Sequence, residues 1–169
     1  MTAPKPVRVL ISYAHDPGVP GHANRALDLA DSLRIRGVEA HIDRYVEHTG
    51  VFWPRWMMDE VRDADFVLCL VSPLYRERFE QSGNPTAGRG VRWEGLIITE
   101  ELYYEPNGGP RKFLAVVMEG ASVDNIPDVL HPYGYTHYCL PADDEVLYRR
   151  LTGQPTVVPP PLGAVVNYR

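Results

Sequence analysis

The chain has 169 residues, of which 44% are apolar and 23% are charged, and its formal net charge at pH 7 is -5. A chain of this length can bury roughly two thirds of the surface that its unfolded form exposes, so we expect a single globular domain. The acidic balance, together with the lack of a basic cluster, argues against a dedicated nucleic-acid-binding protein.

Apolar runs of strand length alternate with helical patterns along the chain, which is typical of a parallel sheet with helices on both faces. Strands are predicted at residues 7–13, 38–43, 65–72, 112–118 and 135–139. Helices are predicted at residues 22–36, 53–65, 90–104 and 142–153. The predicted fold class is therefore α/β, with a doubly wound, five-stranded parallel sheet.

Two connections are predicted to be mobile, because they are polar or glycine-bearing and lack apolar periodicity. The first is residues 44–52, and the second is residues 81–89. The second lies within a polar stretch rich in Gly, Pro and Ser, residues 75–90, which we expect to be a mobile connection preceded by at most one helical turn.

The end of the chain, residues 154–169, contains a proline run that cannot be helical. We expect it to lie extended along the surface or to lead into a linker, since prolines favour extended backbone. The domain is placed at residues 1–163. The terminal residues 164–169 lie outside it and are a possible start of a linker to further domains.

Cysteine and histidine usage gives no sign of a metal site. Cys69 and Cys139 lie in apolar, strand-like contexts, where a free thiol behaves as a small buried hydrophobe, so both are expected to be buried and reduced. The histidines lack metal-binding spacing. The first strand follows a short polar leader directly, without the apolar core of a signal peptide or a membrane span, so we expect a cytoplasmic protein with no membrane contact.

The common phosphate-binding and nucleophile motifs are missing from the sequence. No GxxxxGK[ST] or GxGxxG follows a predicted strand, which disfavours an ordinary nucleotide-binding fold. There is also no GxSxG, and neither cysteine has a basic cluster beside it. The chemistry must therefore be sought in other residues.

Several short segments together resemble a SEFIR domain of the bacterial type, a branch of the Toll/interleukin-1 receptor (TIR) superfamily. They are VLISYAHD (9–16), HIDRY (41–45), WPRWM (53–57), ADFVLCLVSPLY (64–75), GVRWEG (90–95), LTGQP (151–155) and PPLG (160–163). The resemblance covers about residues 7–163. It implies a flavodoxin-like fold with a central five-stranded parallel sheet, in agreement with the element order.

The resemblance implies that Glu94 is a catalytic residue. Many bacterial and plant TIR domains hydrolyse NAD+ with a glutamate early in the helix after the third strand, and Val91 to Glu94 is similar to that pattern. Trp93 adjoins the acid here, whereas in many TIR enzymes it lies about a turn earlier, so Glu100 and Glu101 remain alternatives. A carboxylate against the ribose can stabilise the oxocarbenium ion that forms when nicotinamide leaves. Glu94 could instead be simply an acid in the first turn of a helix, where the helix dipole favours it.

Other polar residues are expected to line the same crevice, because they follow the carboxyl ends of strands. Ser12, Tyr13 and His15 follow the first strand, although Tyr13 could instead pack in the core. Asp43 and Arg44 end the second strand and begin the loop called the BB loop in the TIR family, which contacts a neighbouring protomer and gates the site. Asp43 could instead cap that loop.

The three tryptophans have two interpretations each. Trp53 and Trp56 lie three residues apart on one helix face, where they either pack in the core or stack on an adenine ring. The same choice holds for Trp93, which we include among the substrate-binding candidates.

Two functions follow from the resemblance. The first is an NAD+ glycohydrolase that releases nicotinamide, needs no cofactor or metal, and is completed by self-assembly through residues 44–52 in antiphage immunity. The second is a noncatalytic module that binds other TIR or SEFIR domains.

Overall fold

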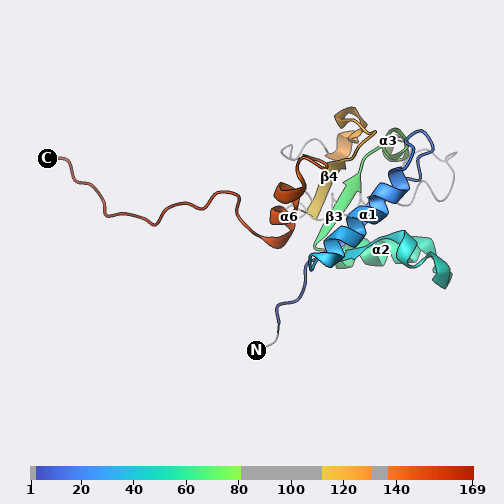
Figure 1. Cartoon of the computed structure of the whole chain (residues 1–169), viewed down its shortest axis with the longest axis horizontal. Helices are drawn as coiled ribbons and strands as arrows, with labels where there is room; N and C mark the ends of the chain where they lie inside the picture. The colour runs from blue at the N-terminus through green and yellow to red at the C-terminus, as the bar shows by residue number, and fades with distance from the viewer. Residues whose placement is uncertain (1–2, 81–111, 131–136) are drawn as a thin grey trace.

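The computed structural model describes residues 3–80, 112–130 and 137–169 (Figure 1). Five strands form one sheet in the order β2-β1-β3-β4-β5, and every pairing is parallel. The strands are β1 Arg8–Tyr13, β2 Glu39–His41, β3 Phe66–Leu70, β4 Phe113–Val117 and β5 His137–Cys139. The predicted doubly wound α/β fold is confirmed.

Helices cover both faces of the sheet. One face packs against α1 (His22–Ile35) and α6 (Asp144–Thr152), and the other packs against α2 (Trp53–Asp63) and α3 (Pro73–Glu80). Short 3-10 helices occur at η1 Asp43–Tyr45, η2 Glu47–Thr49, η3 Val123–Asn125 and η4 Asp128–Leu130. The two apolar layers therefore share the sheet as their common wall.

Strand β3 shows how the sequence dictates this layering. Leu68 and Leu70 belong to the layer beneath α1 and α6, whereas Val67 and Cys69 belong to the layer beneath α2 and α3. Successive side chains of a strand point to opposite faces, so only an unbroken apolar run satisfies both layers. The continuous apolar run that predicts β3 is therefore the pattern expected of a central strand with an apolar layer on each face.

The prediction of at most one helical turn before residue 81 is wrong, because α3 runs from Pro73 to Glu80. Proline suits the first turn of a helix, and the Oγ of Ser72 accepts a hydrogen bond from the N–H of Tyr75 at 3.1 Å. Tyr75 and Phe79, four residues apart, are both buried against the core. This apolar pair was the overlooked helical signal.

Other predicted features differ in detail. Cys69 is buried and free, as expected, but Cys139 is only half-buried, because it lies at the end of the edge strand β5. Strand β2 is shorter than the predicted 38–43, because the chain turns into η1 at Asp43. The predicted helix at 90–104 and the predicted mobile segment at 81–89 lie outside the described residues.

A partly buried ion cluster joins β1, β2 and α2. The Oε1 of Glu60 lies 3.0 Å from the Nη2 of Arg8, and its Oε2 lies 3.5 Å from the Nδ1 of His41. The Oε1 of Glu39 lies 3.0 Å from the Nε2 of His41 and 3.7 Å from Arg8. The hydrogen bond from His41 lowers the pKa of Glu39 against the opposing effect of burial. Four charged or titratable groups thus lock α2 onto the sheet.

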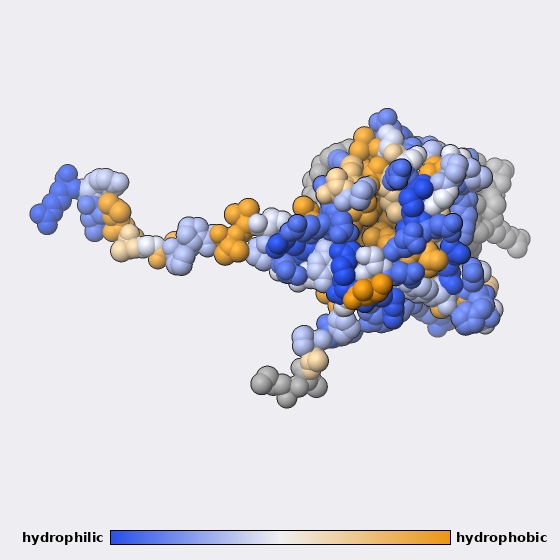
Figure 2. Space-filling view, in the orientation of Figure 1, coloured by the Kyte–Doolittle hydropathy of each residue, from blue (hydrophilic) through white to orange (hydrophobic). Residues whose placement is uncertain are grey.

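Residues 154–169 follow α6 without forming a helix or a strand. Figure 1 shows this segment projecting away from the domain, and Figure 2 shows apolar residues along it. Gly153 ends α6 with φ 69°, in the left-handed region that favours glycine. The proline run forms no helix, as expected, but it projects from the domain instead of lying along its surface, and we call residues 154–169 the tail.

Candidate functional site

Polar side chains meet at the carboxyl ends of β1 and β2. The Oη of Tyr13 donates a hydrogen bond to the Oδ1 of Asp43 at 2.9 Å. The Nε2 of His15 lies 3.1 Å from the Oδ2 of the same carboxylate, and the N–H of Arg44 donates to its Oδ1 at 2.8 Å. One carboxylate therefore joins the loop after β1 to the loop after β2.

The surroundings of Tyr13 keep its phenol protonated. Burial, followed by the negative charge and the hydrogen bond of Asp43, raises the pKa of Tyr13 well above its usual value. The ring of His15 packs against it, with centroids 4.9 Å apart. Because the His15 side chain is largely exposed, a ligand can reach its imidazole while Asp43 holds it in place.

A hollow of about 340 Å³ lies beside these residues, in the connection between β1 and α1. Its wall is formed by residues 15–17 and 19–24. The Nη1 of Arg44 lies 3.2 Å from the Oδ1 of Asn24, on the same rim. The loop that begins at Asp43 therefore reaches the edge of the hollow.

Gly21 allows the wall of this hollow to turn into α1. Its φ is +78°, and a Cβ built there would lie 2.9 Å from the Nη1 of Arg25. The guanidinium of Arg25 folds back over the glycine and donates from Nη2 to the carbonyl of Pro20 at 2.9 Å. A side chain at Gly21 would be strained and would displace Arg25.

Asp16 ties the hollow to the start of α3. Its Oδ2 accepts a hydrogen bond from the N–H of Leu74, and its Oδ1 accepts one from the N–H of Gly18, each at 2.9 Å. Burial raises the pKa of Asp16, but hydrogen bonds from Leu74, Gly18 and Ser72 outweigh it and hold the pKa below its ordinary value. The carboxylate therefore stays charged and caps the helix.

His22 is a buried imidazole in the wall of the hollow, only 1% exposed. Among the described residues, neither ring nitrogen has a hydrogen-bond partner of ordinary geometry, although the backbone of Leu70 lies close enough to raise the pKa. Burial, followed by the charge of Arg25, lowers the pKa of His22 overall, against the effect of Asp16. The buried ring therefore stays neutral in the wall of the hollow.

Lowering the pH is expected to weaken the fold through His22. Because its folded-state pKa lies below the ordinary 6.5, the unfolded chain takes up a proton first as the pH falls. The free energy of unfolding should therefore drop below about pH 6.5 and level off once the pH passes the folded-state pKa. When the pH is lowered from about 7.5 to about 5.5, the urea midpoint of His22→Phe should therefore fall less than that of wild type. Exposed His48 supplies the control, since His48→Phe should follow wild type; an unchanged pH dependence in His22→Phe would count against this account.

The family model for the TIR domain matches residues 9–151 of the chain. The chain belongs to the TIR domain family. No curated protein gives a significant match.

Solved SEFIR domains share the fold of this TIR domain. A prokaryotic SEFIR domain superposes with a TM-score of 0.60 at 23% identity, over 93% of this chain and 99% of that chain. The SEFIR domain of IL-17 receptor B superposes with a TM-score of 0.56 at 17% identity, over 87% of this chain and 95% of that chain. The TIR family expected from the sequence is therefore confirmed by the family model, and these two SEFIR domains show the same fold.

The TIR domain brings together four of the predicted site residues, Tyr13, His15, Asp43 and Arg44. It does not bring Ser12 to them. Successive side chains of β1 point to opposite faces, so Ser12 lies buried in the other layer, where its Oγ is 3.0 Å from the Oη of Tyr75.

The tryptophans of α2 also lie apart from this network. Trp56 packs partly against the core beneath α2, and Trp53 is 43% exposed. Their rings meet edge to face, with centroids 5.6 Å apart. Trp93 and Glu94 lie outside the described residues, so their assignments stay predictions.

Sequence reasoning missed Asp16, His22 and Asn24, which line the hollow. Asp16 was within reach, because it follows His15 directly after the first strand. His22 gave no signal, since a histidine at the start of a helix is usually exposed and its burial depends on how the preceding loop folds.

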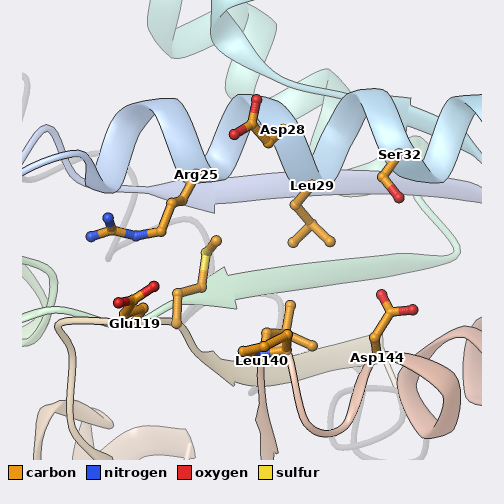
Figure 3. Close-up of a pocket in the computed structure, with 9 residues that line it drawn as sticks. Arg25, Asp28, Leu29, Ser32, Glu119, Leu140 and Asp144 are labelled. Carbon is orange, nitrogen blue, oxygen red and sulfur yellow. The ribbon is translucent and has the colours of Figure 1, made fainter.

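A second hollow of about 320 Å³ lies between α1 and the chain after β4 and β5 (Figure 3). Leu29 and Leu140 lie along its apolar middle, and Arg25 and Glu119 lie at one end (Figure 3). Met118 also lines it. At the other end, Arg36 makes a two-pronged ion pair with Asp144, at 2.9 and 3.0 Å. The groove is thus apolar along its floor and closed by charges.

Two further searches of the described residues gave negative results. Within residues 3–80, 112–130 and 137–169, no three His, Cys, Asp or Glu side chains gather in a way that could hold a metal ion. In the same part of the chain, every helix is too short or too polar to cross a bilayer.

Proposed function

We propose that this TIR domain cleaves NAD+ between nicotinamide and ribose, at the carboxyl edge of its sheet. The observation that carries the proposal is the hollow beside β1, whose wall holds the buried imidazole of His22 and the accessible imidazole of His15. Open α/β sheets bind ligands at this edge. Membership of the TIR family supports the same substrate.

The chemistry asks little of the protein beyond placement and charge. Nicotinamide leaves NAD+ as a neutral molecule, so the bond can break without a second acid, and the ribosyl group that remains carries the developing positive charge. In the proposal, the carboxylate of Glu94 stabilises this positive charge. Water is the final acceptor of the ribosyl group. Tyr13, His15, Asp43 and Arg44 would bind and orient the substrate at the rim of the hollow.

Nicotinamide release from NAD+ by the full chain tests the proposal. The assay is run on concentrated protein with and without a crowding agent, because activation by self-assembly, as a step in defence against phage, is part of the proposal. Nicotinamide should appear in proportion to assembled protein. Assembled, folded wild-type protein that releases none would exclude the glycohydrolase.

A second function, homotypic interaction, is favoured by the surface at the end of the loop 44–52. TIR and SEFIR domains typically interact with one another. Phe52 is 75% exposed and Trp53 is 43% exposed, side by side at the start of α2. Neighbouring exposed aromatic rings are a feature of interaction sites, because they bury large apolar area on contact. This role is compatible with NAD+ cleavage and would also stand without it.

Charge reversal in the loop is expected to reduce self-association more than folding stability. Glu47 is exposed and Arg44 is half-buried, so their replacement by Glu47→Lys or Arg44→Glu should cost little stability. Sedimentation velocity measures the association and urea unfolding measures the stability. Glu145→Lys, at an exposed position on α6, is the matched control. If both loop variants sediment like wild type, residues 44–52 do not form the interface.

A further inference from the structure

The tail exposes an unusual amount of apolar surface for a segment outside the core. Its exposed apolar residues are Val157, Val158, Leu162, Val165, Val166 and Tyr168. Apolar residues flank the run Pro159–Pro161, and the tail carries no charged side chain before Arg169. A disordered linker is normally polar or charged, so this composition is better suited to contact than to solvation.

The direction of the tail is set where it leaves α6. The N–H of Gln154 donates to the carbonyl of Arg149 at 2.9 Å, and the Nη1 of Arg149 donates to the carbonyl of Pro155 at 3.2 Å. Beyond this point the chain leads away from the domain (Figure 1). Consecutive prolines favour the polyproline II conformation, which costs little further entropy to immobilise on a partner.

An exposed aromatic patch, formed by Phe52, Trp53 and Trp56, has the chemistry that such a segment binds. The edge-to-face packing of Trp53 on Trp56 anchors the patch, because Trp56 is partly buried against the core. Phe52 and the outer part of Trp53 remain open. Proline-rich segments dock between aromatic rings of this kind, with proline rings lying against the ring faces.

We propose that the Pro159–Leu162 segment of one copy packs onto the aromatic patch of a second copy. The inference deepens the homotypic role proposed above and rests on it, and it does not depend on NAD+ cleavage. It names the occupant of the surface at the end of the loop 44–52: the tail of the neighbouring protomer.

The fold favours binding of the tail to the patch of a second copy over binding to the patch of its own chain. The tail begins at α6, whereas the patch belongs to α2, and these two helices pack on opposite faces of the sheet. At about 3.1 Å per residue, residues 155–162 extend about 25 Å. To reach the patch of its own chain, the tail would need this length to pass around the sheet from one face to the other. Each copy instead offers a tail on one side and a patch on the other. The contact is therefore head to tail.

The groove in Figure 3 is the competing surface within the described residues. It lies next to the start of α6, and Leu29, Met118 and Leu140 make it apolar. Among the described residues no aromatic side chain lines it, however, so this part of the chain supplies it with no flat ring faces on which proline rings pack. The chemistry of the tail thus favours the patch.

Mixing two full-length variants tests the proposal. Trp53→Ala removes the centre of the patch and keeps the tail, and Leu162→Asp places a charge in the tail and keeps the patch. Wild-type protein should show a weight-average mass that rises with concentration in sedimentation equilibrium. Each variant alone should associate at least ~10-fold more weakly. Mixed together they should form one-to-one pairs that do not grow further, because each pair retains a single intact contact.

Two controls identify the surfaces. Ile35→Asp places a charge at another exposed aliphatic residue and should associate like wild type. Ser32→Arg obstructs the groove of Figure 3 and should also have no effect. If Ser32→Arg weakens association and Trp53→Ala does not, the tail occupies the groove and the proposal is overturned. Variants that fail to pair in the mixture, while wild type associates, overturn it as well. A wild type that stays monomeric would end both this inference and the homotypic role, but not the proposal of NAD+ cleavage.

Discussion

Glu94→Gln is expected to lower NAD+ cleavage by at least ~100-fold while the fold and any self-association persist. The amide has nearly the shape of the carboxylate but lacks the negative charge that stabilises an oxocarbenium ion. The loss should therefore appear in kcat rather than in KM, because the charge acts mainly in the transition state. Nicotinamide release under assembling conditions measures both constants.

Glu100→Gln and Glu101→Gln are the matched controls, since they change the same chemical group within the same predicted helix. Each should retain most of the activity. A Glu94→Gln variant with the wild-type rate would remove this residue from catalysis, and a large loss in Glu100→Gln or Glu101→Gln instead would move the assignment along the helix.

Glu60→Ala should lower the free energy of unfolding by about 2 to 3 kcal/mol, because it leaves the Arg8 guanidinium without its closest carboxylate in a mostly buried position. This loss is smaller than the roughly 3 to 5 kcal/mol expected for a fully buried pair, since the Arg8 side chain is partly exposed and Glu39 still lies 3.7 Å from it. Urea unfolding at neutral pH measures the change.

Two comparisons isolate the cause. Asp59→Ala breaks the exposed pair of Arg55 and Asp59 on the same helix and should change stability by less than about 0.5 kcal/mol. The double variant Arg8→Met/Glu60→Met should lose less than Glu60→Ala, because no charge is left unpaired beside it. Equal losses in Glu60→Ala and Asp59→Ala would show that the cluster contributes nothing specific.

The sheet could be predicted from the sequence because strands that are buried on both faces require continuous apolar runs. An unbroken apolar run as short as residues 66–70 is typical of a strand that is covered on both sides. Helix α3 left a weaker record, since its buried contacts come from Tyr75 and Phe79 among charged neighbours. Local composition then favoured a loop, and tertiary packing decided for a helix.

The candidate site was predictable only as far as strand ends determine it. Tyr13, His15 and Asp43 meet because parallel strands bring their carboxyl ends to one edge. Ser12 follows the same rule of position, but the alternation of side chains turns it to the opposite face. The burial of His22 depends on the path of the loop before α1, and no local pattern encodes that path.

Asp16 links the hollow to α3, because its carboxylate lines the hollow and also accepts a hydrogen bond from the N–H of Leu74. A ligand that draws Asp16 toward the hollow would take the cap from the N–H of Leu74 and loosen the first turn of α3. By reciprocity, whatever steadies that turn must change the affinity of the hollow by the same factor. Occupancy of the hollow and the stability of the first turn of α3 would therefore be coupled through Asp16.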